Sequence, residues 1–172
     1  MKTMERVDKI LAHPEFQVYM RRIREQERTR VFCLHGIEHS LDVARIGYIK
    51  NLEQGLSLRQ DVIYAMALLH DIGRCEEYAS GKSHHEAGAE LARPILLACG
   101  YTEHECAEIC DAIGRHKAPS EQARSLATLL YDADKRAAVR HVPVVEVYET
   151  VLLHVTHPFI QIKMLYASGV ER

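Results

Sequence analysis

Apolar residues recur every three to four positions along most of the chain, which is the spacing of amphipathic helices. Residues 3–12 form a short amphipathic start, and Pro14 can open a second helix because proline suits the first helical turn. A third helix is expected from about residue 38 to 52, and a continuous apolar run follows at residues 62–69. These patterns predict an all-α protein, a single-domain helical bundle over residues 1–172.

Residues typical of helix ends separate these segments. Gly55 closes the third helix, and Gly100 ends a helix expected over residues 84–99. Glu86 and Glu105 each stand three positions after a candidate N-cap, which predicts two capping boxes. The candidate N-cap residues of the predicted helices are Ser57, Ser83 and Thr102.

The other segments carry weaker signals. Residues 76–82 are expected to form a loop, because Ser80-Gly81 interrupts a helix. A further helix is expected from Ser120 to Asp134 or beyond. Residues 144–155 are rich in valine, so a strand competes with a helix there, and Pro158 can begin a final short helix.

The composition is that of an ordinary globular domain, with 47% hydrophobic and 27% charged residues. A formal net charge of −2 gives no overall attraction to nucleic acids or anionic membranes. Arginines at residues 21–30 alternate with Glu25 and Glu27 without interleaved aromatic residues, which predicts a solvated helix face and no strong nucleic-acid signal. Five cysteines without a CxxC pair indicate buried, reduced thiols.

The start of the chain lacks the apolar segment of a signal peptide. No apolar stretch approaches the roughly 18 residues that a membrane span requires. We therefore expect a cytoplasmic protein without membrane contacts. The oligomeric state, including a homo-oligomer, stays open.

Two adjacent residues that can bind a metal, His70 and Asp71, end the apolar run. Burying both is costly unless a partner satisfies them, and a divalent cation would do so. His39 and Asp134 are candidate partners, because a bundle core can bring distant helices together. Singly, each of the four has an ordinary structural explanation, and only together do they point to a metal. The mixed nitrogen and oxygen set suits one or two divalent ions, with Fe, Mn, Zn, Co, Ni or Mg as candidates.

Three segments carry a family resemblance: residues 39–44 (HSLDVA), 67–73 (ALLHDIG) and 132–135 (DADK). In this order they resemble the core motifs of the HD-domain metal-dependent phosphohydrolase superfamily, over roughly residues 35–140. The resemblance implies an α-helical domain on which the terminal helices pack. It also implies hydrolysis of a phosphoester, often in a nucleotide, with a divalent metal held by His39, His70, Asp71 and Asp134.

Two more segments are similar to a binuclear branch of that superfamily. Residues 85–90 (HEAGAE) resemble its H-x-x-G-A helix start, and residues 113–117 (IGRHK) resemble its later I-x-x-H segment. The resemblance implies that His85 and His116 hold a second metal, with Asp71 as the bridge. Adjacent helical residues point about 100° apart, so at most one of His84 and His85 is expected to face the site, and the family pattern selects His85. His84 is then either a neighbour of the helix cap or a group that supports the ligands.

Cationic residues next to these motifs are candidates for contacting phosphate. Arg74 and Lys135 adjoin predicted ligands, and arginine adds a bidentate fork. The family commonly has lysine at the position of Arg74, which leaves the phosphate geometry open. Asp71 or a nearby carboxylate is the candidate acceptor of the proton of the attacking water. His35 lies one turn before His39 and is either a substrate or proton-donor residue or a plain loop residue. Arg115 and Lys117 are weaker candidates.

The sequence thus predicts an enzyme, a metal-dependent phosphohydrolase acting on a small phosphorylated molecule, most simply a nucleotide. A ligand-binding or regulatory module with a structural metal is the alternative from another class. A di-iron oxygenase of the same superfamily is a third hypothesis, since six ligands would permit it.

Overall fold

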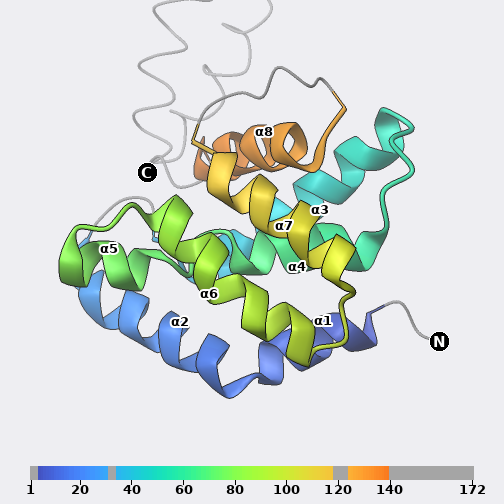
Figure 1. Ribbon diagram of the computed structural model, residues 1–172. Helices are drawn as coiled ribbons and strands as arrows, with labels where there is room; N and C mark the ends of the chain where they lie inside the picture. Colours follow the sequence, from blue (N-terminus) through green and yellow to red (C-terminus); the bar gives the residue numbers. More distant parts are fainter. Residues whose placement is uncertain (1–3, 31–33, 118–123, 140–172) are drawn as a thin grey trace, which may run out of the picture. The chain divides into compact units, whose positions relative to one another are not determined.

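The computed structural model describes residues 4–30, 34–117 and 124–139, which are helical with short connections. No strand occurs in this part of the chain, so the predicted all-α fold is confirmed. The helices, drawn in Figure 1, are α1 (Glu5–Ala12), α2 (Pro14–Gln26), α3 (Ile37–Glu53), α4 (Gln60–Leu69), α5 (Arg74–Ser80), α6 (His84–Ala98), α7 (Glu103–Arg115) and α8 (Leu126–Val139).

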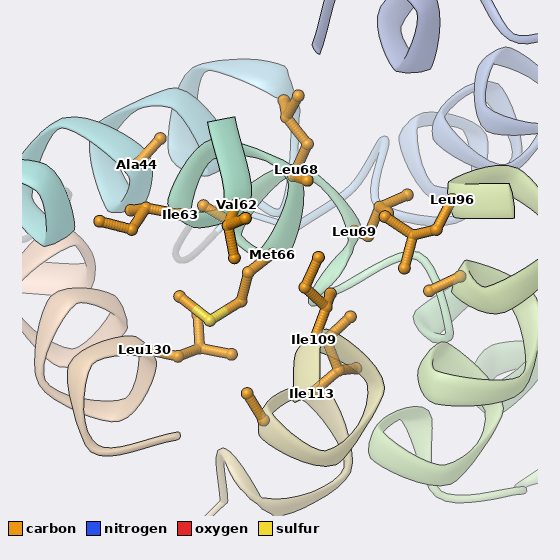
Figure 2. Packing of buried hydrophobic residues seen from close by; sticks show 14 of the residues in the cluster. Ala44, Val62, Ile63, Met66, Leu68, Leu69, Leu96, Ile109, Ile113 and Leu130 are labelled. Atoms are coloured by element: carbon orange, nitrogen blue, oxygen red, sulfur yellow. The ribbon is translucent and has the colours of Figure 1, made fainter. Parts of the chain in front are cut away.

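Helix α4 is the centre of the bundle and corresponds to the continuous apolar run. It packs against α1, α3, α6, α7 and α8, and an apolar helix is stable only when it is enclosed in this way. Figure 2 shows the side chains of Met66 and Leu69 between those of neighbouring helices, among them Leu96, Ile109 and Leu130. The end of α4 therefore delivers His70 and Asp71 into the interior of the protein.

The turn after α4 packs very closely on the start of α6 through two glycines. A Cβ atom on Gly73 would lie 2.1 Å from the His84 carbonyl oxygen and 2.4 Å from the Gly88 nitrogen. A Cβ atom on Gly88 would lie 3.3 Å from the His70 carbonyl oxygen. No side chain fits at Gly73, so this contact brings the first turn of α6 next to Asp71.

The loop expected over residues 76–82 is largely a helix, because α5 spans Arg74–Ser80. Gly81 adopts a left-handed conformation (φ 78°) and marks the C-terminal end of α5. Glu76 and Glu77 stand in its first turn, where carboxylates are favourable. The Ser80-Gly81 signal is therefore a helix end and not the centre of a loop.

The predicted caps have different outcomes. Thr102 and Glu105 form the expected capping box at the start of α7. Ser83 precedes α6 but makes no capping hydrogen bond, and its Oγ atom lies 3.1 Å from His85 Nδ1.

Ser57 is not an N-cap: it has a φ of 60°, and α4 begins later, after Arg59. Asn51 organises this connection instead, by bonding both backbone groups of Leu58.

A buried ion network joins the N-terminal helix to the bundle. The Arg6 guanidinium donates to Asp61 of α4 and to Glu105 of α7. It also stacks 3.9 Å from the centroid of the Tyr101 ring. Arg6 thereby connects α1, α4 and α7, and its pKa is raised by the two carboxylates.

Several expectations lie outside the described residues. They are the helix start at Ser120, the strand or helix over residues 144–155, the final helix from Pro158 and its packing on the domain. Among the described helices, none is long and apolar enough to cross a membrane.

Candidate metal centre

The four residues of the predicted first metal site lie together, although they come from two helices, α3 and α8, and the turn after α4. His39 stands in the first turn of α3, and its Nε2 atom lies 3.1 Å from Asp134 Oδ1 of α8. His70 Nε2 lies 3.0 Å from Asp71 Oδ2 and 3.8 Å from Asp134 Oδ1. His39 Nε2 is 3.7 Å from Asp71 Oδ2. The structure thus brings all four ligand groups to one point.

Two atoms at this point are buried without a hydrogen-bond partner, His70 Nε2 and Asp71 Oδ2. The other ring nitrogen of His70 donates to the Ala67 carbonyl oxygen at 2.7 Å, so Nε2 is the atom whose lone pair would bind a cation once the ring is neutral. Unpaired buried polar atoms are rare in native proteins and require an explanation. A cation bound between them would satisfy both atoms, so the residues present fit a metal.

The electrostatics show the same need for positive charge. Burial disfavours protonation of His70, but the carboxylates of Asp71 and Asp134 outweigh it and raise the His70 pKa to about 10. Burial opposes the ionised form of Asp71 as well, yet His70 and Arg74 hold the Asp71 pKa well below its ordinary value. The pKa of Asp134 is also lowered, by His39 and His70 against the effect of burial. A proton on His70 therefore takes the place that a cation would take.

A second cluster lies beside the first and contains His84, His85 and His116, whose ligand atoms are within 4.8 Å of one another. The His116 ring is 5.3 Å from that of His70 and 4.4 Å from that of His85, between centroids. Burial lowers the pKa of His116 to about 3 and that of His85 to about 4, with neighbouring positive charge adding to it. Both rings are therefore neutral, the form that binds metals.

His84 and His85 both face this cluster, which corrects the expectation that only one would. Their rings stack with centroids 3.7 Å apart and an interplanar angle of 35°. His84 is the first residue of α6, and helical side chains lean toward the N-terminus, so its ring reaches back over the helix end. Glu77 of α5 holds it there by accepting from Nδ1 at 2.9 Å. The 100° rotation between adjacent helical residues therefore does not keep the two rings apart at a helix end.

The predicted phosphate-binding cations have different surroundings. Arg74 donates from Nε to Asp71 Oδ1 at 2.8 Å, and its side chain is 18% exposed. Lys135 lies 3.3 Å from Asp134 Oδ2 and is mostly exposed. Arg115 instead pairs with Asp111 on the exposed face of its own helix, and Lys117 is exposed. Arg74 and Lys135 therefore adjoin the first cluster, and their contact with phosphate stays a prediction.

Sequence reasoning missed a buried group next to the first cluster. Glu27, expected on a solvated face, is only 5% exposed and accepts hydrogen bonds from the backbone and ring of His35. The Tyr78 hydroxyl donates to it at 2.6 Å. Burial would raise the Glu27 pKa, but these hydrogen bonds outweigh it and lower the pKa to about 2. His35, whose role the sequence left open, is thus buried and held by Glu27. Its ring centroid lies 5.8 Å from that of His39.

A hollow of about 210 Å³ opens beside His35 and the first cluster. It is lined by Arg30, Leu34, His35, His39, Arg74, Asp134, Lys135 and Ala138. Arginine and lysine side chains around a cavity attract anions. Nothing in the charge run of residues 21–30 distinguished Arg30 or Glu27 from their exposed neighbours.

The fold and the two clusters define an all-α protein with a histidine- and aspartate-rich centre that could hold divalent metal. The family model described as HD domain matches residues 36–139, and the chain belongs to this family. HD domains bind divalent metals, and HD superfamily hydrolases are generally metal-dependent phosphohydrolases.

Several known proteins are similar to this chain. An uncharacterized protein of Clostridium beijerinckii is 37% identical over 132 residues, which are 77% of this chain and 83% of that protein. Ribonuclease Y of Oceanobacillus iheyensis is 30% identical over 130 residues, 74% of this chain but only 22% of the ribonuclease. The crystal structure of a predicted HD superfamily hydrolase from an uncultured Thermotogales bacterium has a TM-score of 0.55 and 27% identity. The similarity covers 81% of this chain and 76% of that one.

Proposed function

We propose that the protein is a metal-dependent phosphohydrolase that cleaves a phosphoester of a small phosphorylated metabolite, with a nucleotide as the expected substrate. The observation that carries the proposal is the pair of buried, unpartnered atoms His70 Nε2 and Asp71 Oδ2. With His39 and Asp134 they form a nitrogen and oxygen donor set suited to a divalent cation. Membership of the HD family supports the reaction class.

The side chains around the proposed site have separate tasks. A bound divalent ion would polarise phosphoryl oxygens and lower the pKa of a water. Asp71 is fixed by Arg74 on Oδ1 and directs Oδ2 toward His39 and His70, so this carboxylate can hold a cation and orient a water beside it.

The hollow beside the first cluster suits the anionic part of a substrate. Arg74 and Lys135 line it together with Arg30, and cationic donors stabilise the charge that develops on a phosphoryl group in transfer. A volume of about 210 Å³ is small, which favours a phosphate group on a small molecule. His35 also lines the hollow, where its ring is held by Glu27 and can exchange a proton with a substrate oxygen.

A second candidate substrate is an RNA phosphodiester, favoured by the similarity to ribonuclease Y. The chain matches about a fifth of that protein's length, so most of the ribonuclease has no counterpart in the match. A substrate panel separates the candidates: nucleoside monophosphates, p-nitrophenyl phosphate, bis-p-nitrophenyl phosphate and a short single-stranded RNA.

The test combines metal content with turnover. Protein purified without added metal is analysed for bound metal, then assayed on the panel with Mn²⁺, Co²⁺ or Fe²⁺. We expect bound metal and hydrolysis in the native protein, and loss of both in Asp71→Ala with helicity retained. Asp111→Ala is the matched control, because Asp111 is an exposed aspartate on α7. Full metal and full activity in Asp71→Ala would overturn the proposal.

Two other outcomes would assign a different function. Tight metal without hydrolysis of any phosphoester would indicate a binding or regulatory module. Consumption of dioxygen by the iron-loaded, reduced protein would indicate the oxygenase.

A further inference from the structure

We propose that His84 is a ligand of a second metal site, in which it joins His85 and His116 beside the Asp71 carboxylate. The family resemblance assigns two imidazoles to such a site and leaves the residue before His85 without a role. The inference rests on the proposed function in so far as the centre holds metal. It adds a third nitrogen donor, which changes what the second site binds.

The position of His84 carries the proposal. Its Nε2 atom lies 3.9 Å from Asp71 Oδ1, while the other oxygen of that carboxylate is turned to His39 and His70. One ligand atom each of His84, His85 and His116 can be chosen so that all three lie within 4.8 Å of one another. Donors that share one ion lie at most about 4 Å apart, because metal–nitrogen bonds are about 2 Å long. The three imidazoles, gathered within 4.8 Å, therefore need only small side-chain shifts to bind a common ion.

The second nitrogen of each ring is held by another group. Glu77 accepts from Nδ1 of His84 at 2.9 Å, and the Ile113 carbonyl accepts from Nδ1 of His116 at 2.6 Å. Ser83 Oγ lies 3.1 Å from Nδ1 of His85. A carboxylate that accepts from a histidine and fixes its lone pair is the usual support of a metal-binding histidine. Glu77 has this relationship to His84.

Arg74 is the main competitor for the Asp71 carboxylate at this side. Its Nε atom donates to Asp71 Oδ1 at 2.8 Å, and its Nη1 atom is 3.5 Å from Glu77 Oε2. A carboxylate oxygen has two lone pairs and can serve both a guanidinium and a cation. Arg74 therefore orients the oxygen that the second site would share.

The two sites would differ in chemistry. The first offers two imidazoles and two carboxylates, whereas the second offers three imidazoles and one carboxylate oxygen. Nitrogen-rich sites favour Fe²⁺, Co²⁺ and Zn²⁺ over Mg²⁺ and Mn²⁺. We therefore expect two ions of Co²⁺ per chain, with the second site the more selective against Mg²⁺.

The experiment is a Co²⁺ titration of metal-free, full-length protein by calorimetry and by visible absorption. The native protein should bind two equivalents, and His84→Ala should keep one while the affinity for the other falls by more than about tenfold. His84→Gln repeats the test if His84→Ala fails to fold, as judged by circular dichroism. His104→Ala is the control, because this histidine of α7 is exposed and lies outside both clusters.

Each outcome of the titration supports or refutes the His84 site. Two equivalents with unchanged affinity in His84→Ala, or only one equivalent in the native protein, would overturn the proposal. Two equivalents in the native protein, one in the variant and no hydrolysis of any phosphoester would support the site while refuting the proposed function. No Co²⁺ binding at all would refute both the His84 site and the proposed function.

Discussion

Gly73 and Gly88 lie so close that a Cβ atom on the first would be 2.4 Å from the backbone nitrogen of the second. This contact joins the turn that carries Asp71 to the helix that carries His84 and His85. The two clusters are neighbours because neither backbone has a side chain at this crossing. The glycine of the HDIG segment thus has a packing function besides any role in the turn.

Gly73→Ala should therefore destabilise the protein. The new methyl group would collide with backbone atoms, which cannot move aside as a flexible side chain can, so we expect a loss of about 3 kcal/mol in the free energy of unfolding. Gly114→Ala is the matched control, because nothing lies within 4 Å of a Cβ there and alanine favours a helix. Urea denaturation of both variants measures the difference. Equal stability would refute the packing role.

Glu105 should give the protein a defined sensitivity to acid. Hydrogen bonds from Arg6 outweigh burial and lower the Glu105 pKa from 4.5 to about 2. The stabilisation from this group is therefore complete above pH 4.5 and is lost as the pH falls toward 2. Glu105→Gln should be less stable than the native protein at pH 6, and the difference should shrink between pH 4.5 and 2.

The pH series needs a control because other carboxyls titrate in the same range. Glu27 also has a lowered pKa of about 2, so the total stability falls for more than one reason. The comparison is therefore between variants at each pH, with Glu108→Gln as the exposed control on the same helix. A constant difference between native protein and Glu105→Gln from pH 6 to 2 would contradict the prediction.

The sequence predicted the fold well where one signal dominated. The apolar run at residues 62–69 became the central helix, and Thr102 and Glu105 formed their capping box. The apolar run and the capping box both depend on residues that are adjacent or three positions apart. Ser57 failed as a cap because its position after Gly55 lies in a tight connection with positive φ, which no local pattern revealed.

The candidate site was predictable only as far as its motifs reach. Motifs pointed to His39, His70, Asp71 and Asp134, and the structure brings them together. The role of His84 depends on its bond to Glu77, seven positions away across the connection between α5 and α6. Glu27 is held by His35, eight positions away, and by Tyr78, which is 51 positions away. A buried glutamate within a charged run has the same local pattern as a solvated one, so only the tertiary contacts separate them.

Glu27 should act as a positioning residue for His35. Its carboxylate accepts from both the ring and the backbone nitrogen of His35, so Glu27→Gln would weaken the charge-assisted bond that orients the ring. We expect kcat on the preferred phosphoester to fall about tenfold, and His35→Ala to lower it by about a hundredfold. Glu25→Gln, an exposed neighbour, should leave kcat unchanged. A rise in KM alone in Glu27→Gln, with the pH profile unmoved, would assign the pair to substrate binding instead.

Metal binding should stabilise the protein and release a proton. The His70 pKa is raised to about 10 by Asp71 and Asp134 against the effect of burial, so His70 is protonated at neutral pH until a cation displaces the proton. Affinity for Co²⁺ should therefore rise about tenfold per pH unit between pH 6 and 8, and saturating Co²⁺ should raise the Tm. At a Co²⁺ concentration one hundred times Kd, the free energy of unfolding should rise by about 2.7 kcal/mol.

Calorimetry in buffers of different ionisation enthalpy counts the proton that His70 releases. Asp71→Asn should show neither the Tm shift nor the proton release, and a full Tm shift in that variant would place the metal elsewhere.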